Sequence, residues 1–326
     1  MGNHIEILII GAGPIGISCG IEAKSQGLDY KIIDKGCLVN SIHNFPEDMT
    51  FFSSAEKLEI GDLPFTSLAR RPSKQETLEY YRRVTDHYKL NLGLYESFKS
   101  ILPVDNHSTR FKVATSKDTY TCNYIINATG FYDLPTLMNV IGEDLEKVNH
   151  YFTSAHHLYN QKVAVIGASN SAIDVAMEGY RKGAEVTVLV RKEKISDSVK
   201  YWIKPDFEGR VKEGHIKVYY ESEVKEIKEN TIVFNHKGTL IELENDFVYA
   251  MTGYQPNFKL MEKLGIKLDV KGLPQYSDQT METNATGVYL AGVVCGGVDT
   301  REWFIENSRD HGEKIMNHIK ETENES

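Results

Sequence analysis

Residues 5–16 read Ile5-Glu6-Ile7-Leu8-Ile9-Ile10-Gly11-Ala12-Gly13-Pro14-Ile15-Gly16, an apolar run that leads directly into a glycine-rich turn. The first six residues are mostly apolar and β-branched, which predicts a buried parallel strand. Gly11 permits a sharp exit from the strand, and Gly13 lets the backbone approach a pyrophosphate. Gly16 allows close packing of the following helix, whose N-terminus supports the anion.

The second strand supports the same interpretation of the turn. Tyr30-Lys31-Ile32-Ile33-Asp34 is a short apolar run that ends in an acid, 23 residues after Gly11. At this distance a carboxylate accepts hydrogen bonds from a ribose hydroxyl. Strand, turn, helix and acid together predict a dinucleotide-binding βαβ unit.

A second βαβ unit begins with the strand at residues 162–166 and turns at Gly167-Ala168-Ser169-Asn170-Ser171-Ala172. Ser169 takes the place of the middle glycine; serine is small enough for close approach, and its hydroxyl could bond a phosphate. The next strand ends at Arg191-Lys192 and not at an acid. A carboxylate there would repel a 2′-phosphate, whereas a guanidinium binds it in a bidentate fashion, so the sequence favours NADPH over NADH. The alternative is that both cations merely solvate a strand end.

The two turns therefore predict two dinucleotides, FAD at the first and NADPH at the second. Ala128-Thr129-Gly130 and Met251-Thr252-Gly253 each end a strand with small residues, where the chain is expected to cross between domains. The predicted fold class is α/β, with two Rossmann-like dinucleotide-binding domains and the NADPH domain inserted in a discontinuous FAD domain. We expect the FAD domain to comprise residues 1–132 and 255–326, and the NADPH domain residues 133–254.

Composition excludes several other classes of protein. The 326 residues are 41% hydrophobic and 25% charged, which is typical of a globular protein with room for two domains. The net charge of −9 argues against partners such as nucleic acid or a membrane surface. Neither a membrane span nor a signal peptide is expected, so a cytoplasmic location is predicted.

The four cysteines are scattered along the chain, at Cys19, Cys37, Cys122 and Cys295. They form no C-x-x-C pair and have no histidines at metal-ligand spacing, so reduced thiols and no metal site are expected.

Longer strings resemble the low-molecular-weight thioredoxin reductase family over essentially the whole chain, and within it most closely the YpdA-type group, the proposed bacillithiol disulfide reductases. The strings that carry the resemblance are Asn44-Phe45-Pro46, Thr50-Phe51-Phe52-Ser53-Ser54, Glu56-Lys57-Leu58-Glu59-Ile60-Gly61-Asp62, Ala250-Met251-Thr252-Gly253-Tyr254, Ser198 to Pro205 and Phe304-Ile305-Glu306-Asn307. The resemblance implies an FAD-dependent enzyme that takes hydride from NADPH and passes electrons to a small-molecule disulfide or another small acceptor. A homo-oligomer is expected.

Two departures from the family pattern bear on the chemistry, and a third difference from thioredoxin reductases, Val293, fits the YpdA-type group. Thioredoxin reductases carry a C-x-x-C dithiol upstream of the second glycine turn, whereas residues 150–153 here read His150-Tyr151-Phe152-Thr153. The bacillithiol-type group commonly has a cysteine after Gly-x-Gly-Pro, and here that residue is Ile15. Val293 follows Ala291-Gly292 where thioredoxin reductases have an aspartate that binds the ribityl chain, and this leaves the contact to backbone amides.

Several side chains can be interpreted in two ways. Phe51 and Phe52 resemble residues near a flavin ring, but they also suit an ordinary core. Trp303 could cover the flavin or simply pack, and His156 and His157 could donate protons or be structural. No catalytic side chain is assigned, because the chemistry is expected at the flavin. The residues expected to contact the cofactors are Gly11, Gly13, Pro14, Ile15, Gly16, Asp34, Lys35, Asn40, Phe51, Phe52, Thr129, Gly130, Gly167, Ser169, Asn170, Ser171, Arg191, Lys192, Gly253, Gly292 and Val293.

Three other functions fit the same motifs. A thioredoxin-reductase-like ferredoxin or flavodoxin–NADP reductase also lacks the dithiol and would prefer one-electron acceptors. A flavin monooxygenase would form a long-lived peroxyflavin. A non-catalytic flavin redox sensor would bind FAD tightly, turn over negligibly and bind a partner according to the oxidation state of the flavin.

Overall fold

The computed structural model describes residues 3–106 and 109–324, and the chain divides into two compact units. Unit 1 comprises Met1–Asn44, Met49–Leu134 and Tyr254–Ser326, and unit 2 comprises Phe45–Asp48 and Pro135–Gly253. The chain leaves unit 1 in β9 (Leu134–Pro135) and returns at β18 (Tyr254–Gln255). Unit 2 is therefore an insertion in unit 1.

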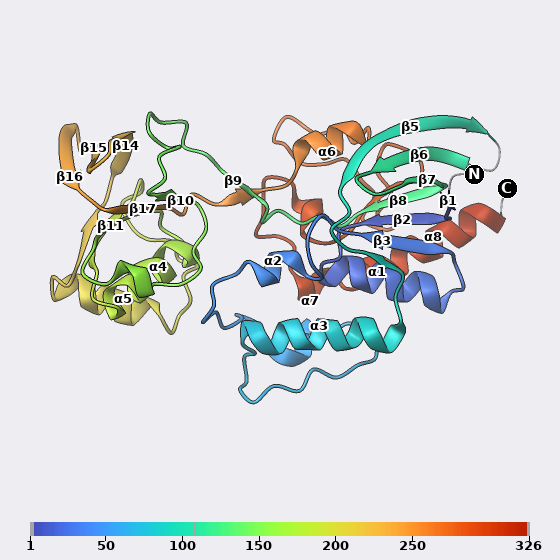
Figure 1. The fold of residues 1–326 in the computed structure, drawn as a ribbon, viewed down its shortest axis with the longest axis horizontal. Helices are drawn as coiled ribbons and strands as arrows, with labels where there is room; N and C mark the ends of the chain where they lie inside the picture. Colours follow the sequence, from blue (N-terminus) through green and yellow to red (C-terminus); the bar gives the residue numbers. More distant parts are fainter. Residues whose placement is uncertain (1–2, 107–108, 325–326) are drawn as a thin grey trace. The chain divides into compact units, whose positions relative to one another are not determined.

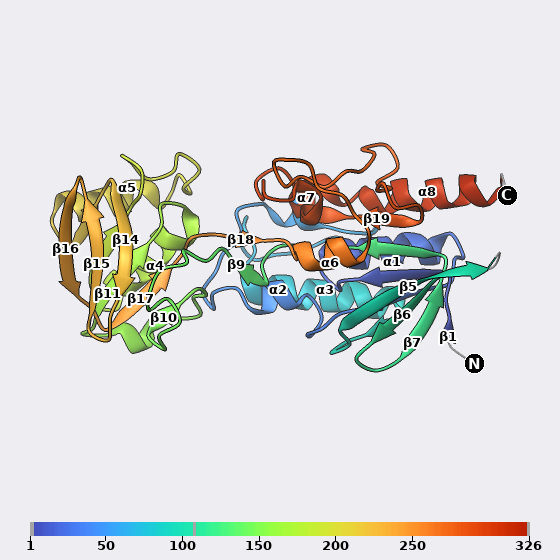
Figure 2. The same cartoon turned by 90° about the horizontal axis from the view of Figure 1, so that it is seen from above.

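A five-stranded parallel sheet forms the centre of unit 1 (Figure 1), in the order β19-β8-β2-β3-β4. Its strands are β2 (Ile7–Ile10), β3 (Tyr30–Ile33), β4 (Leu92–Gly93), β8 (Tyr124–Asn127) and β19 (Val288–Leu290). The helices α1 (Pro14–Ser25) and α8 (His311–Asn324) cover one face of this sheet, and a second sheet covers the other, as Figures 1 and 2 show. Coverage on both faces explains why residues 7–10 are all apolar.

The second sheet of unit 1 has the order β1-β7-β6-β5. Its strands are β1 (Asn3–His4), β5 (Phe98–Asn106), β6 (Thr109–Thr115) and β7 (Thr119–Cys122). The sequence predicts one strand from Tyr120 to Ile126, but the structure has two strands, β7 and β8, in different sheets. The chain changes sheets at Asn123, where the amides of Asn123 and Tyr124 both donate to the Glu6 carbonyl at 3.0 Å.

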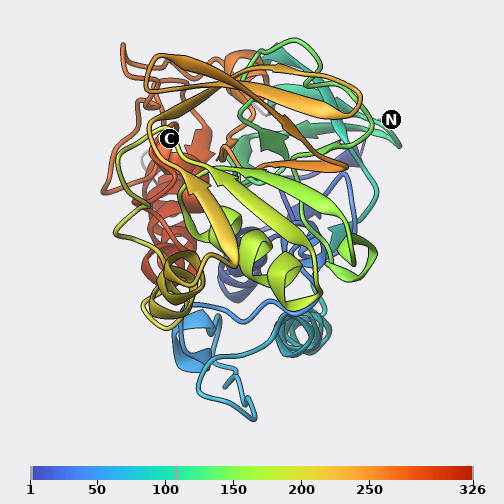
Figure 3. The same cartoon turned by 90° about the vertical axis from the view of Figure 1, so that its left-hand side faces the viewer.

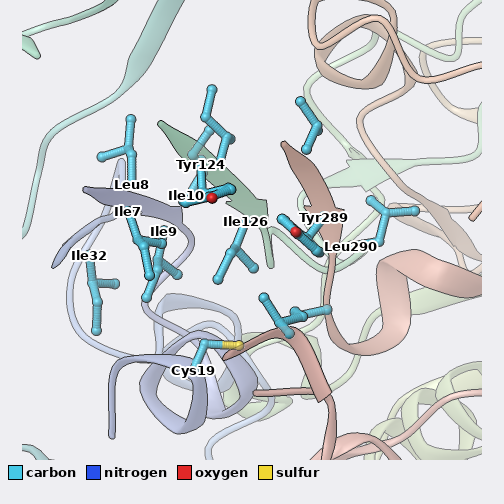
Figure 4. Packing of buried hydrophobic residues seen from close by; sticks show 14 of the residues in the cluster. Ile7, Leu8, Ile9, Ile10, Cys19, Ile32, Tyr124, Ile126, Tyr289 and Leu290 are labelled. Carbon is cyan, nitrogen blue, oxygen red and sulfur yellow. The ribbon is translucent and has the colours of Figure 1, made fainter. Parts of the chain in front are cut away.

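Side chains on β2 alternate between the two faces of the central sheet (Figure 4). Ile7 and Ile9 point toward α1 and Cys19, whereas Leu8 and Ile10 point to the opposite face, with Tyr124. Ile7, Leu8 and Ile9 are fully buried, and burial of each such side chain stabilises the fold by about 1.5–3 kcal/mol.

The sequence Pro72-Ser73-Lys74-Gln75-Glu76 predicts a capping box at the start of a helix, and α3 (Lys74–Tyr88) begins there. The Ser73 amide donates to Glu76 Oε2 at 2.8 Å, and the Glu76 amide donates to Ser73 Oγ at 3.3 Å, which completes the expected capping box. The other short helices of unit 1 are α2 (Asn40–His43), η1 (Ala55–Leu58) and α6 (Phe258–Lys263). The sequence predicts a single final helix that opens at residues 300–304 and runs through Ile319. The structure instead has η3 (Gly292–Gly296), α7 (Ile305–Ser308) and then α8.

Unit 2 repeats the same three-layer plan (Figure 3). Its parallel sheet has the order β10-β17-β11-β12-β13. The strands are β10 (Val148–Asn149), β11 (Lys162–Ile166), β12 (Glu185–Leu189), β13 (Ile216–Tyr219) and β17 (Phe247–Ala250). One face carries α4 (Asn170–Arg181) and α5 (Lys204–Lys212), and a short turn η2 (His156–Leu158) lies between β10 and β11 in the chain. The other face carries the antiparallel strands β14 (Ser222–Ile227), β15 (Thr231–His236) and β16 (Thr239–Glu244).

Side chains of β11 alternate between two buried clusters, one on each face of this sheet. Val163 and Val165 pack into the core cluster under α4, whereas Ala164 and Ile166 pack with Phe234 of β15. The predicted fold class, α/β with two Rossmann-like units and one inserted in the other, is confirmed. Across the described residues, no helix combines the length and the apolar character needed to cross a bilayer.

Candidate functional site

The three glycines of the first turn differ in what surrounds them. Gly11 has φ +115°, and a Cβ there would lie 2.4 Å from the Ala128 carbonyl oxygen. A Cβ on Gly16 would lie 1.8 Å from the Gly11 carbonyl oxygen, whereas a Cβ on Gly13 would meet nothing within 4 Å. Gly11 and Gly16 are therefore required by packing. The face of Gly13 is open to a ligand.

The turn leads into α1 without a side-chain cap. Gly13 is the N-cap residue, and Pro14 follows in the first turn of the helix. The amides of a first turn have no intrahelical partner, and no side chain of the N-cap residue occupies them here. This helix end can therefore accept an anionic group.

Asp34, at the end of β3, is held in place by two backbone amides. The Ala12 amide donates to Asp34 Oδ2 and the Gly36 amide to Oδ1, both at 2.8 Å. Burial raises the pKa of this carboxyl, and the two amide hydrogen bonds oppose the shift. Each oxygen keeps a further lone pair, so the carboxylate can still accept a hydrogen bond from a sugar hydroxyl.

The two neighbours of Asp34 predicted to contact a cofactor have internal partners. Lys35 Nζ lies 2.8 Å from Asp133 Oδ2 in a largely exposed pair. Asn40 begins α2, and its Oδ1 accepts a long hydrogen bond of 3.6 Å from Cys37 Sγ. Both side chains stay close to the Asp34 segment.

A cavity of about 320 Å³ opens in unit 1 at the carboxyl ends of the central strands. It is lined by Gly11, Asp34 and Lys35 from the first βαβ unit, and by Thr129 and Gly130 after β8. A crevice at the carboxyl ends of parallel strands is where open α/β sheets bind ligands. The structure therefore brings these five predicted residues together at one cavity.

The same cavity has lining residues that the motifs did not indicate. These are Glu96, Ser97, Phe98, Asn257, Lys259 and Lys263. Glu96 is buried and accepts hydrogen bonds from Tyr120 Oη at 2.9 Å and from Thr115 Oγ1 at 2.6 Å. No local pattern marks these residues, because they come from the start of β5 with the two residues before it and from α6 with its N-cap, far from either glycine turn.

Thr129 and Gly130 form a tight turn after β8. The Thr129 amide and hydroxyl both donate to Asn127 Oδ1, at 3.3 and 2.8 Å. Gly130 has φ +68°, and its hydrogen side faces Val293 Cγ2, 3.7 Å from an ideal Cβ. Val293 thus lies beside the strand end that the sequence assigns to the same cofactor.

Ile15 and Gly292 also meet. Gly292 has φ +82°, and an ideal Cβ there would lie 3.1 Å from Ile15 Cγ1. Ile15 is buried, and the Gly292 amide donates to Nδ1 of His311 at 3.1 Å. The position where the YpdA-type group commonly has a cysteine is therefore filled by a buried aliphatic side chain.

Phe51 and Phe52 lie in different environments. Phe51 is buried, and its amide donates to the Pro72 carbonyl at 3.0 Å. Phe52 is 57% exposed, and its carbonyl accepts from Arg71 Nε at 3.0 Å. Core packing therefore accounts for Phe51, while Phe52 presents an aromatic face to solvent.

Two other candidates, Trp303 and His157, make packing contacts, and His156 is exposed. Trp303 stands edge-on to His311, with ring centroids 4.6 Å apart. His157 Nε2 lies 2.9 Å from Tyr249 Oη, and its ring packs edge-on against Phe247. The structural role suggested for His157 accounts for its position.

The second glycine turn, in unit 2, again requires glycine at its first position. Gly167 has φ +142°, and a Cβ there would lie 2.6 Å from the Met251 carbonyl oxygen. Ser169 is the N-cap of α4, its hydroxyl makes no capping bond, and both Ser169 and Ser171 are exposed. Two hydroxyls are thus available beside the N-terminus of a 12-residue helix.

Asn170, predicted to contact a cofactor, has its side chain bonded to a neighbouring loop. Its Nδ2 donates to the Ser198 carbonyl at 3.2 Å, and its Oδ1 accepts from the Lys200 amide at 2.8 Å. Lys200 Nζ also pairs with Asp174 Oδ2 at 2.8 Å, and both side chains are mostly buried. Asn170 and Asp174 therefore hold residues 198–200 against the first two turns of α4.

Arg191 and Lys192 follow β12 and are exposed. The Lys192 carbonyl accepts from the Glu221 amide at 3.0 Å, which fixes the backbone. Neither side chain forms a salt bridge with any residue between 3 and 324 that the structure describes. Gly253 has φ +102°, and an added Cβ would meet nothing within 4 Å.

The four cysteines are free thiols, and Cys19, Cys122 and Cys295 are buried. Burial raises the pKa of Cys19 and Cys122 to about 12, and that of Cys295 well above its ordinary value. Cys37, which is half-buried, also has a raised pKa, chiefly from burial and then from the nearby Asp34 charge. All four are protonated at neutral pH, so none is an activated nucleophile.

Comparison with known proteins agrees with this geometry. Residues 8–292 match the family model described as pyridine nucleotide-disulphide oxidoreductase. The chain is 45% identical to bacilliredoxin reductase Bdr of Bacillus subtilis (strain 168), over 98% of each chain. The solved bacillithiol disulfide reductase Bdr (YpdA) of Staphylococcus aureus has a TM-score of 0.94 at 39% identity and covers 98% of this chain and 99% of its own. That of Bacillus cereus has a TM-score of 0.95 at 40% identity, with 98% and 100% covered.

Proposed function

Because the chain belongs to the pyridine nucleotide-disulphide oxidoreductase family, and within it to the bacillithiol disulfide reductase group, we propose that it reduces a small-molecule disulfide with electrons from NADPH through FAD. The observation that carries the proposal is the full-length likeness to two solved bacillithiol disulfide reductases, on a chain that keeps both glycine turns. The acceptor that the relatives' names suggest is bacillithiol disulfide.

The residues of unit 1 suit FAD. We assign residues 1–132 and 255–326 to its domain. The open face of Gly13 at the uncapped start of α1 would take the pyrophosphate, and Asp34 would accept a ribose hydroxyl. Thr129 and Gly130 line the same cavity, and Val293 lies beside Gly130.

The residues of unit 2 suit NADPH, to which we assign residues 133–254. Gly167, Ser169 and Ser171 would face the dinucleotide phosphates at the start of α4. The exposed Arg191 and Lys192 would bind the 2′-phosphate that distinguishes NADPH from NADH. No acid stands at the end of β12 to accept a 2′-hydroxyl.

When bound, the flavin would supply the chemistry, taking hydride from the nicotinamide and passing electrons to the disulfide. The chain's part is to bind both nucleotides and to keep competing groups away. Its own thiols are protonated at neutral pH, and Ile15 places an aliphatic group where a thiol would otherwise stand. We therefore propose that no protein thiol takes part in the relay.

The first test follows flavin absorbance without oxygen after addition of NADPH or NADH to the purified protein. Fast bleaching by NADPH and slow bleaching by NADH are expected. Absence of a bound flavin, or equal bleaching by both nucleotides, would contradict the cofactor assignment.

The second test adds acceptors to the NADPH-reduced protein. We expect multiple turnovers with bacillithiol disulfide and few with ferredoxin. The reverse order would identify the ferredoxin–NADP reductase alternative, which the aliphatic Ile15 also suits. Tight flavin with no turnover of any acceptor would identify the redox sensor.

A further inference from the structure

His311 is a fully buried imidazole that the proposed chemistry does not use. It is the first residue of α8, with 0% of its surface exposed. Its Nδ1 accepts the hydrogen bond from the Gly292 amide at 3.1 Å. Because Nδ1 is the acceptor, the neutral ring carries its proton on Nε2.

The other nitrogen of this ring has no conventional acceptor. Nε2 is buried and has no hydrogen-bond partner in the described part of the chain. Trp303 stands nearly perpendicular to the imidazole, at an interplanar angle of 77° and a centroid distance of 4.6 Å. The indole ring therefore packs against the imidazole at close range.

The surroundings keep the imidazole neutral. Burial lowers the pKa of His311 to about 4, with Asp310 opposing the shift and Lys314 adding to it on the same helix, and with Asp278 opposing it from another segment. From η3, Cys295 Sγ lies 3.9 Å from Nδ1 and is itself protonated. At neutral pH the ring is therefore always able to accept a hydrogen bond.

The hydrogen bond to Gly292 fixes a segment in direct contact with the first glycine turn. Gly292 adopts φ +82° and packs against Ile15, the second residue of α1. The following residue, Val293, lies beside Gly130. One side chain thus holds a turn that lies against the start of α1 and against Gly130, which lines the cavity.

We propose that His311 is a positioning residue for FAD, which holds the Gly292 amide and so keeps residues 292–296 in the conformation that receives the cofactor before the cofactor arrives. The inference rests on the proposed function, since that assigns Gly292 and Val293 to FAD. His311 does not contact the reacting atoms and acts only through the turn.

A matched pair of substitutions separates the hydrogen bond from packing. In His311→Asn the amide oxygen occupies the place of Nδ1 and can accept from Gly292, whereas His311→Leu fills a similar volume without an acceptor. We expect His311→Leu to weaken FAD binding to the apoprotein about tenfold, the usual effect of losing one buried acceptor. We expect His311→Asn to stay within about threefold of the original protein. His318→Asn on the same helix, whose Nδ1 lies 3.0 Å from Tyr289 Oη, is the control and should leave FAD affinity unchanged.

FAD affinity is measured by quenching of flavin fluorescence, and the thermal midpoint of each flavin-free protein is recorded beside it. Equal loss of affinity in the Asn and Leu variants, or unchanged affinity in both, would overturn the inference. Absence of FAD binding by the original protein would instead overturn the proposed function.

Hydrogen exchange on the unmodified apoprotein keeps the inference testable if the Leu variant does not fold. Peptides covering residues 292–296 should already be protected without FAD. Protection that arises only on addition of FAD would show that the cofactor, and not His311, orders this turn.

Discussion

Gly13 and Gly16 stand three residues apart in the same turn, yet a methyl group added at each would meet different surroundings. At Gly16 it would lie 1.8 Å from a backbone oxygen, so the chain has to move. At Gly13, where φ is −76°, it would project into open space. Packing therefore requires glycine at position 16 but leaves the face of Gly13 open.

We expect Gly13→Ala to leave the flavin-free protein folded, because the backbone angles suit alanine and no atom lies within 4 Å. The same change should weaken FAD binding at least tenfold, since the methyl group occupies the space proposed for the pyrophosphate. Circular dichroism melting of the apoprotein and its FAD content after dialysis measure the two effects. Gly16→Ala is the matched variant and should lose the fold itself. Full FAD content in Gly13→Ala would contradict the placement of the cofactor.

Arg191 carries the choice between the two nicotinamide dinucleotides in our proposal. Arg191→Ala should raise KM for NADPH about tenfold to a hundredfold, because a charge-assisted hydrogen bond contributes about 1.5–3 kcal/mol. The KM for NADH and the kcat with either nucleotide should change little. Steady-state kinetics with both nucleotides are the measurement, and Lys182→Ala, an exposed cation after α4, is the control. A parallel rise in both KM values would mean that Arg191 does not contact the 2′-phosphate.

At the scale of elements, the capping box at the start of α3 stabilises the helix through local hydrogen bonds. Hydrogen bonds from the backbone amides of Ser73 and Leu68, and from the Ser73 hydroxyl, lower the pKa of Glu76 to about 2. A carboxyl whose pKa is depressed on folding contributes stability above its unfolded pKa near 4.5, and this contribution is lost as the pH falls through about 2.

Replacement of Glu76 by Gln should therefore lower stability at pH 7 and make it less dependent on pH between about 4.5 and 2. Ser73→Ala should cost about 1 kcal/mol, the usual loss for a serine N-cap. Urea unfolding at several pH values gives both quantities. An unchanged pH dependence in Glu76→Gln would show that this carboxyl is not the titrating group.

In unit 2 the loop 198–200 depends on one mostly buried ion pair. Asp174→Asn leaves Lys200 without its charge partner, and loss of one member of a buried pair is strongly destabilising. We expect a lower melting temperature and a higher KM for NADPH, because the loop lies against the first turns of α4. Glu208→Gln, at an exposed carboxylate of α5, is the control and should change neither. An unchanged KM for NADPH in Asp174→Asn would show that residues 198–200 do not contribute to nucleotide binding.

At the scale of the whole molecule, none of the four thiols is activated, so activity should not depend on a cysteine. Iodoacetamide applied to the NADPH-reduced protein should leave disulfide reduction largely intact, because three of the four thiols are buried and all four have raised pKa values. Mass spectrometry should find label only on Cys37. Inactivation together with label on Cys19 or Cys295 would reveal a thiol relay.

The sequence predicted those parts of the fold that depend on interactions between residues close together in the chain. Both glycine turns, the acid at Asp34 and the cap at Ser73 depend on a few adjacent residues, and each element lies where it was predicted. The change of sheet at Asn123 depends on the distant Glu6 carbonyl, so one strand was predicted where there are two. Glu96 and Lys259 reach the cavity only through tertiary packing, and no spacing marks them. The predicted cofactor contacts themselves stay predictions.

The insertion of unit 2 also sets an order of events on the ribosome. Residues 135–253 are contiguous and can collapse as soon as they emerge, but the central sheet of unit 1 needs β19, at Val288–Leu290. The N-terminal strands of unit 1 therefore cannot complete their sheet until β19 has been synthesised. Until then, the edge of β8 that pairs with β19 is unpaired. The proposed FAD site includes Gly292 and Val293, so we expect the cofactor to bind only after these residues have been synthesised. A chain that stalls before residue 288 would expose the apolar strands of unit 1 to chaperones.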